Sequence, residues 1–173
     1  TTRAGSNHVL ASVANGDGGE FAHWLRMPRG DWHQVTRFDD EVVSAVLAPG
    51  DCLFVLSRKH APRGRILDIP LASPELGRAR LVVPEASESI QGFEVTDSTL
   101  YVRYVDGGPS LLRTFDRSGA PRGTIAIEPV SAVSELVPLD ADDVLFRAES
   151  FLTPPAWHRV KGASQEVRRT RLR

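Results

Sequence analysis

The chain repeats a strand pattern at a nearly constant spacing, and this repeat limits the folds that it can adopt. A strong apolar strand follows a polar turn at Leu53, Leu100 and Val144, and a fainter copy begins at Val9. The starts of these strands are 44, 47 and 44 residues apart. Self-similarity at a fixed period indicates an architecture in which one small supersecondary unit is repeated along the chain.

Each repeat contains further strands, which are separated by short loops rich in Gly and Pro. Runs such as Leu53–Leu56 and Leu81–Val83 are apolar and bounded by turn residues, which is the pattern of β-strands. The best helical candidate, Ser73–Leu81, has room for about one turn. We therefore predict an all-β chain. The loops between the second and third strands are expected at residues 15–20, 59–64, 106–110 and 152–156, and the units at residues 8–38, 42–84, 90–128 and 132–172.

Three of the units have four predicted strands, whereas the first unit lacks its opening strand. Four strands in every ~44 residues match the size of a β-propeller blade. The sequence therefore predicts a partial β-propeller of about four blades made of four-stranded antiparallel sheets. Because a closed ring normally needs more blades, we expect a piece of a larger propeller that starts in mid-structure. A β-sandwich, which also uses short strands at regular spacing, stays the alternative.

Composition excludes several classes of function. With 21 Lys and Arg against 22 Asp and Glu, the net charge is −1, so no nucleic-acid partner is expected. The single cysteine, Cys52, excludes an intrachain disulfide and zinc sites built on several cysteines. No apolar run approaches the ~20 residues of a membrane span, so no membrane partner is expected. We expect a soluble protein of the cytoplasm or periplasm and leave the compartment open.

The motifs of common catalytic sites are missing. The chain has neither a G-x-S-x-G nucleophile elbow nor a phosphate-binding G-x-x-x-x-G-K-[ST] loop. Its histidines lack metal-ligand spacing, and surface-exposed or hydrogen-bonded histidines are the simpler interpretation. The carboxylates of residues 39–41 and 140–143 lie in predicted turns, where Asp side chains cap the backbone. We therefore expect no catalytic residue, no metal site and no cofactor within these residues.

Four segments together resemble the later blades of the propeller in prolyl oligopeptidase-type serine peptidases. They are SRKHAPRGRILDIPL (57–71), RLVVPE (80–85), LYVRYVDGGPSLLRTFD (100–116) and VLFRAESFLTPPAWHRV (144–160). The resemblance runs from about Val9 to Leu172 in the order of the family. It implies a seven-bladed propeller that caps an α/β-hydrolase domain and admits short peptides. It also implies that the catalytic Ser, Asp and His belong to that hydrolase domain, outside these residues.

Strand direction indicates which loops face such a catalytic domain. In a four-stranded antiparallel sheet, the loop between the second and third strands lies at the same end as the exit of the fourth strand. These loops are therefore expected to point toward the hydrolase domain. Arg58 is the main substrate-facing candidate, because similar enzymes place a propeller arginine there against peptide carbonyls. Arg63, Trp157 and His158 are further candidates. Arg58 could instead pair with a neighbouring loop or with the hydrolase surface, and Trp157 could pack between blades.

Two functional hypotheses follow. In the first, the chain is the substrate-gating propeller segment of a prolyl oligopeptidase-like serine peptidase that hydrolyses short, proline-containing peptides, and it is inactive alone. Its partners are then the α/β-hydrolase domain of the parent chain and the peptide substrate. In the second, the chain is a non-enzymatic propeller scaffold that binds proteins or peptides. In either case, uncovered blade faces predict self-association, with two copies completing a ring-like assembly.

Overall fold

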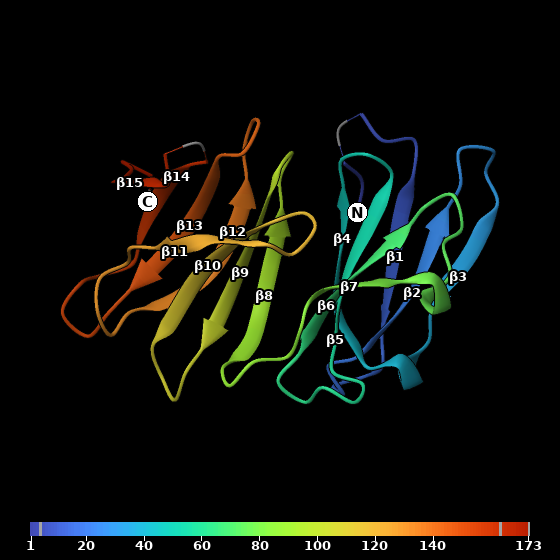
Figure 1. Ribbon diagram of the computed structural model, residues 1–173, viewed down its shortest axis with the longest axis horizontal. Coiled ribbons are helices and arrows are strands. Elements are labelled where there is room, and N and C mark those ends of the chain that lie inside the picture. Colours follow the sequence, from blue (N-terminus) through green and yellow to red (C-terminus); the bar gives the residue numbers. More distant parts are fainter. Residues whose placement is uncertain (4, 163, 173) are drawn as a thin grey trace. The chain divides into compact units, whose positions relative to one another are not determined.

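The computed structural model describes residues 1–3, 5–162 and 164–172 (Figure 1). It divides into two compact units, Thr1–Ala86 and Ser87–Arg173. Within each sheet, every strand pairs antiparallel with its neighbours in sequence, so each sheet is an up-and-down meander. The described residues form fifteen strands and two 3-10 helices, which confirms the all-β prediction.

Unit 1 contains a three-stranded and a four-stranded sheet. Sheet 1 consists of β1 (Val9–Ala14), β2 (Phe21–Arg26) and β3 (Trp32–Thr36). Sheet 2 consists of β4 (Val42–Ala48), β5 (Cys52–Ser57), β6 (Arg65–Pro70) and β7 (Arg80–Val83). The 3-10 helix η1 (Phe38–Asp40) links the two sheets, and η2 (Leu76–Arg78) is the short helical turn expected within Ser73–Leu81.

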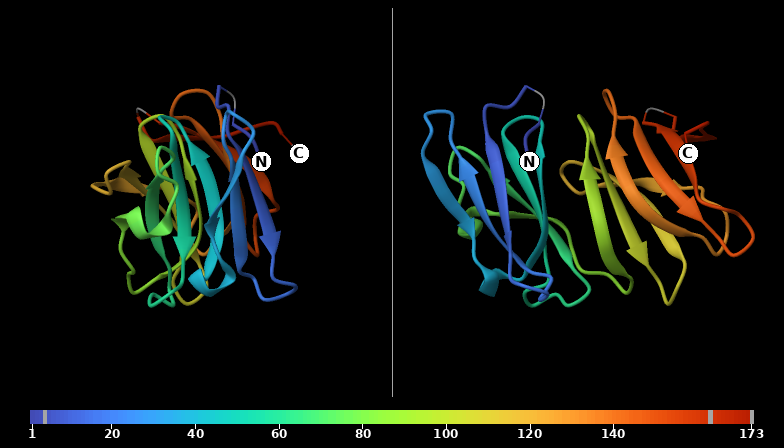
Figure 2. Two further views of the ribbon diagram at one scale, coloured as in Figure 1. Left: turned by 90° about the vertical axis from the view of Figure 1, so that its right-hand side faces the viewer. Right: turned by 180° about the vertical axis from the view of Figure 1, so that it is seen from behind.

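Unit 2 contains two four-stranded sheets, each with the usual twist of a β-sheet (Figure 2). Sheet 3 consists of β8 (Ser89–Val95), β9 (Thr99–Val105), β10 (Ser110–Asp116) and β11 (Pro121–Ile125). Sheet 4 consists of β12 (Ala132–Pro138), β13 (Val144–Glu149), β14 (Ala156–Lys161) and β15 (Glu166–Arg169). In sheets 2, 3 and 4 alike, a β-bulge shifts the register near the start of the first strand.

The hydrophobic core of each unit lies between the facing surfaces of its two sheets. In unit 1, Leu10 and Leu25 of sheet 1 pack with Leu53 and Val55 of sheet 2. In unit 2, Tyr101 and Leu112 of sheet 3 join a cluster with Phe146 and Val160 of sheet 4. β5 is buried from Leu53 to Ser57, so both of its faces are covered. This explains why its sequence is a continuous apolar run and does not alternate with polar residues.

The sheets of unit 2 are also joined by a polar clasp at Asp142, in the β12–β13 turn. Its carboxylate accepts hydrogen bonds from the Thr96 hydroxyl at 2.7 Å and from the Ser98 hydroxyl and backbone N–H, both at 2.6 Å. The Tyr101 hydroxyl donates to the Asp142 carbonyl at 2.7 Å. The β12–β13 turn is therefore hydrogen-bonded to the β8–β9 turn of sheet 3. This confirms a structural role for the acidic segment.

The surroundings of Asp142 explain a glycine and a pKa shift. A Cβ atom on Gly162 would lie 2.5 Å from the Asp142 carbonyl oxygen, so only glycine fits there. Burial raises the pKa of Asp142, but the hydrogen bonds from Ser98 and Thr96 outweigh burial and hold the pKa below its ordinary value. The ionised form of Asp142 is thus the form that stabilises the fold.

We predict that Asp142→Asn destabilises the chain by about 1–3 kcal/mol at pH 7, because charge-assisted hydrogen bonds are lost. The lowered pKa means that the stabilisation is present above the ordinary pKa of 3.8 and disappears as the pH falls through the folded-state value. Thermal unfolding at pH 7 and pH 3 measures both effects. Asp97→Asn is the matched control, because it changes an exposed carboxylate in the β8–β9 turn. Equal unfolding temperatures for the two variants at pH 7 would contradict the clasp.

His23 of β2 is a buried histidine, with 1% of its surface exposed. Its Nδ1 lies 2.8 Å from the Thr36 hydroxyl, and the same hydroxyl accepts the His23 backbone N–H at 3.1 Å. Burial lowers the pKa of His23 from 6.5 to about 4. His23 is therefore a hydrogen-bonded core residue, in agreement with its simpler interpretation from the sequence.

Because the unfolded chain protonates His23 more readily than the folded one, acid should favour unfolding. The loss of stability begins near pH 6.5 and is complete below about pH 4. From pH 7 to pH 4.5, we expect His23 to account for about 2–3 kcal/mol. His23→Asn, which does not titrate, should flatten the dependence of unfolding temperature on pH in this window. The exposed His33→Asn should leave the wild-type profile intact, and an unchanged profile for His23→Asn would refute the assignment.

Candidate functional site

The β5–β6 connection, Arg58–Gly64, carries the two arginines predicted to face a substrate, and we call it the arginine loop. It begins where the buried strand β5 ends at Ser57. Two residues with left-handed backbone turn the chain, His60 with φ of 55° and Gly64 with φ of 93°. The Ala61 side chain points inward and is 3% exposed, which ties the loop tip to the sheet. The loop therefore returns to β6 along a compact path.

Hydrogen bonds to neighbouring segments fix the arginine loop in unit 1. The Arg58 N–H donates to the Glu41 carbonyl at 2.9 Å, and the Ser57 hydroxyl donates to the Asp40 carbonyl at 2.9 Å. On the other side, the Arg63 N–H donates to the Glu85 carboxylate at 2.7 Å. The backbone of the loop is thus held from the η1 side and from the end of β7. A loop braced on a rigid sheet is a suitable platform for binding residues.

The charges of the arginine loop are divided between paired and unpaired groups. The Lys59 ammonium lies 3.2 Å from the Asp40 carboxylate and is largely neutralised by it. Arg58 and Arg63 are exposed, and within the described part of the chain neither guanidinium has a hydrogen-bond acceptor or a carboxylate partner. These two side chains can therefore offer donors to an outside group without breaking an internal contact.

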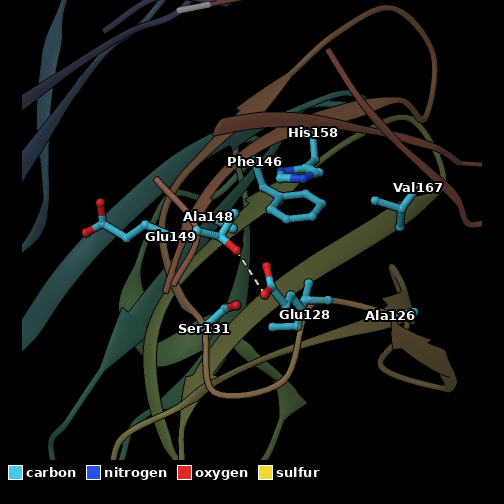
Figure 3. A pocket seen from close by; sticks show the side chains of 10 residues that line it. Ala126, Glu128, Ser131, Phe146, Ala148, Glu149, His158 and Val167 are labelled. Carbon is cyan, nitrogen blue, oxygen red and sulfur yellow. Dashed lines mark hydrogen bonds between the residues drawn. The ribbon is translucent and has the colours of Figure 1, made fainter. Parts of the chain in front are cut away.

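Trp157 and His158 lie in strand β14 and not in a loop. As neighbours in a strand they point to opposite faces of sheet 4. The His158 ring stacks on Phe146, with ring centroids 5.1 Å apart and an interplanar angle of 16° (Figure 3). Trp157 points to the other face and is partly exposed. The structure thus places Arg58 and Arg63 on one loop and separates Trp157 from His158. A substrate-facing role for all four residues stays a prediction.

His158 lines a cavity of about 220 Å³ between the β11–β12 connection and strands β13, β14 and β15 of sheet 4. Figure 3 shows Phe146, Val167 and Ala148 along its apolar wall and Glu128 near its rim. The Glu128 carboxylate accepts the Thr153 hydroxyl at 2.9 Å, so this acidic group already has a partner. The described lining of the cavity combines apolar side chains with the polar groups of Glu128 and Thr153, and the buried Nδ1 of His158 has no hydrogen-bond partner among the described residues.

Sequence reasoning missed the residues that position the arginine loop. Asp40 was interpreted only as a turn residue, and it does accept the Arg37 N–H at 2.8 Å. It also meets Ser57 and Lys59, which lie 17 and 19 residues later. The Glu85 carboxylate accepts the N–H of Arg63, which lies 22 residues earlier. No local motif signals such contacts, since they depend on the register of the sheet.

Catalytic and metal-binding arrangements are not found in the residues that the structure describes. No group of three or more His, Cys, Asp or Glu side chains there could hold a metal ion. No described segment forms an α/β-hydrolase domain, since the strands all belong to the four meander sheets. Neither of the described helices has the length and apolar character required to cross a membrane.

Solved structures of peptidases share this fold. One from a mechanistic study of two prolyl endopeptidases has a TM-score of 0.78 and 23% identity over 95% of this chain and 26% of its own. Prolyl oligopeptidase B from Galerina marginata has a TM-score of 0.79 and 14% identity over 94% of this chain and 24% of its own. Oligopeptidase B from Trypanosoma brucei, with covalently bound antipain, has a TM-score of 0.73 and 19% identity over 94% of this chain and 27% of its own.

The chain therefore spans about a quarter of the length of these solved structures. Among curated protein sequences, no match is found. A family model does match, and its description is prolyl oligopeptidase, N-terminal beta-propeller domain. The match covers residues 2–173 and confirms both the predicted propeller and the family resemblance. The chain thus belongs to the family of prolyl oligopeptidase N-terminal β-propeller domains.

Proposed function

We propose that the chain acts as the substrate-gating propeller segment of a serine peptidase that hydrolyses short, proline-containing peptides. The observation that carries this proposal is the family match over residues 2–173. The peptidases with this fold extend well beyond the matched segment, which supports an α/β-hydrolase domain of the parent chain as the partner. Cleavage then proceeds through an acyl-enzyme on residues of that domain. The segment contributes access and binding, and it is inactive alone.

Within this proposal, the arginine loop is the part that contacts the peptide. The antiparallel topology places the β5–β6 loop at the same end of sheet 2 as the C-terminal end of β7. Arg58 and Arg63 are exposed there, on a backbone fixed by Glu41 and Glu85. A guanidinium offers several N–H donors, which suits the carbonyl oxygens of an extended peptide. Arg58 is the principal contact, and Arg63 supports it.

Removing Arg58 in the full-length peptidase should weaken peptide binding. A hydrogen bond from a charged group contributes about 1.5–3 kcal/mol, so Arg58→Ala should raise KM about 10- to 100-fold and change kcat less than about twofold. Steady-state kinetics on a proline-containing chromogenic peptide measures both constants. Arg29→Ala is the matched control. Arg29 is exposed in the β2–β3 turn, which lies at the end of sheet 1 opposite to its β1–β2 loop. Equal KM values for the two variants would refute the role of Arg58.

The isolated chain tests the assignment of catalysis to another domain. Incubated with the same chromogenic peptide, the 173-residue chain should release no product above the buffer rate. The physical reason is that no described residues form a nucleophile and base arrangement. A full-length parent protein serves as the positive control. Hydrolysis by the purified chain that survives repeated chromatography would overturn the assignment, whereas an inactive parent would contradict the peptidase proposal itself.

A further inference from the structure

The cavity of about 220 Å³ beside sheet 4 lies within unit 2, and hydrogen bonds hold its walls in place. The β11–β12 connection forms one wall. Its Ser131 carbonyl accepts the Ser110 N–H of β10 at 2.9 Å. Its Glu128 carboxylate accepts the Thr153 hydroxyl of the β13–β14 loop at 2.9 Å. The connection is therefore fixed to both sheets of the unit, and the cavity is a defined feature of the fold.

His158 brings a buried hydrogen-bonding atom to this cavity. Its Nδ1 is shielded from solvent and has no hydrogen-bond partner among the described residues. The ring cannot easily turn away, because it stacks on Phe146 with ring centroids 5.1 Å apart, and Phe146 is 1% exposed. A buried polar atom without a partner costs free energy. A ligand that donates a hydrogen bond to Nδ1 removes this cost.

Ser131 adds a second polar group on the opposite wall. Figure 3 shows Phe146 and His158 on one side of the cavity, and Ser131 and Glu128 on the other. Ser131 is 3% exposed, and its hydroxyl makes no hydrogen bond within the described part of the chain. A hydroxyl oxygen has two lone pairs, so it can accept from a ligand. Two acceptors on facing walls are thus available to one donor-rich group.

The charge of the lining favours a cation. The described lining contains the carboxylates of Glu128 and Glu149 and neither Lys nor Arg. Glu128 faces the cavity, whereas Glu149 points away from it (Figure 3). The Thr153 hydroxyl uses only part of the accepting capacity of the Glu128 carboxylate. A cleft lined by charges of one sign attracts the opposite charge and repels its own, so anionic ligands are disfavoured here.

The remaining lining suits a short hydrocarbon chain. Ile127, Phe146 and Val167 contribute apolar side chains from the connection, from β13 and from β15. Covering these side chains with carbon removes apolar area from water. The volume corresponds to about seven water molecules at ~30 Å³ each, which leaves room for a chain of about four carbons and its head group.

We propose that this cavity binds a small primary alkylammonium group. Its N–H groups donate to His158 Nδ1, with the imidazole proton on Nε2, and to the Ser131 hydroxyl. Glu128 supplies the opposite charge, and the alkyl chain covers Phe146 and Val167. This inference goes beyond the proposed peptidase function and does not depend on it, because it uses only the lining of the cavity.

Titration of the isotope-labelled chain with n-butylammonium chloride, followed by NMR, tests the site. We expect saturable shifts of the cavity residues and of the His158 ring nitrogens, with Kd on the order of 1 mM. n-Butanol has the same carbon chain without the charge and should bind at least about fivefold more weakly. Butyrate should leave the His158 resonances unchanged, because Glu128 repels it. Equal affinities for n-butanol and n-butylammonium would overturn the proposal, as would no shift at about 50 mM n-butylammonium.

Two variants assign the roles of the polar groups. His158→Phe keeps a ring stacked on Phe146 but removes the acceptor, so Kd should rise about tenfold or more. Glu128→Gln should raise Kd about two- to fivefold, since this carboxylate is exposed and its attraction is screened. His33→Phe and Glu135→Gln change exposed residues outside the cavity and are the matched controls. Both controls should bind n-butylammonium as the wild type does.

A stability measurement separates ligand binding from a purely structural role of His158. His158→Phe should unfold at a temperature no lower than the wild type, because it removes a buried polar atom without a partner. A lower unfolding temperature would show that Nδ1 already has a partner in the free chain and would contradict the proposal. Ser131→Ala, checked by circular dichroism, should raise Kd about three- to tenfold and keeps the test open if His158→Phe does not fold. An unchanged Kd in every folded cavity variant would place the binding elsewhere and overturn the assignment.

One further probe separates the two sources of this chemistry. The amide of Nα-acetyl-lysine carries the same alkylammonium group on a peptide backbone. An affinity equal to that of n-butylammonium assigns the cavity to a lysine side chain of a peptide. A weaker affinity assigns it to a free amine, because the cavity then has no room for the attached backbone.

Discussion

The need of each sheet to be covered on both faces determines the rest of this structure. β5 is buried from Leu53 to Ser57, and Tyr101 and Leu112 of sheet 3 are buried against sheet 4. A four-stranded sheet cannot supply such cover by itself, because hydrophobic stabilisation requires apolar area to be removed from water. Sheets therefore come with neighbours, and polar contacts such as the clasp at Asp142 fix their alignment.

Because burial is satisfied between sheet faces, the connecting loops are free to carry function. The arginine loop contributes only the small side chain of Ala61 to the interior. Its long side chains, Arg58 and Arg63, remain in solvent while Asp40 and Glu85 brace the backbone around them. Such a division suits a family in which a propeller adjoins a catalytic domain. Under the proposed function, the sheets provide rigidity and the loops at one end contact the peptide.

Strand runs predicted the fold because they depend on local composition. Leu53–Leu56 and the repeats of it at Leu100 and Val144 were enough to place sheets and loops. The contacts of side chains were not predictable in the same way. Asp142 binds Thr96 and Ser98 over more than forty residues, and its role depends on how two turns meet. The register between β13 and β14 stacks His158 on Phe146, a contact that no local motif signals, and its substrate-facing role stays a prediction.

The simple meander of every sheet has a consequence for how the chain acquires its structure. All ladders join strands that are adjacent in sequence, so closing each sheet requires loops of modest length and little entropy. Sheet 2 has all of its pairing partners once Val83 has been synthesised. The core of unit 1 can therefore condense on the ribosome while unit 2 is still being translated. Synthesis in this order would then cover the face of β5 that carries Leu53 and Val55 before the later, equally apolar strands emerge.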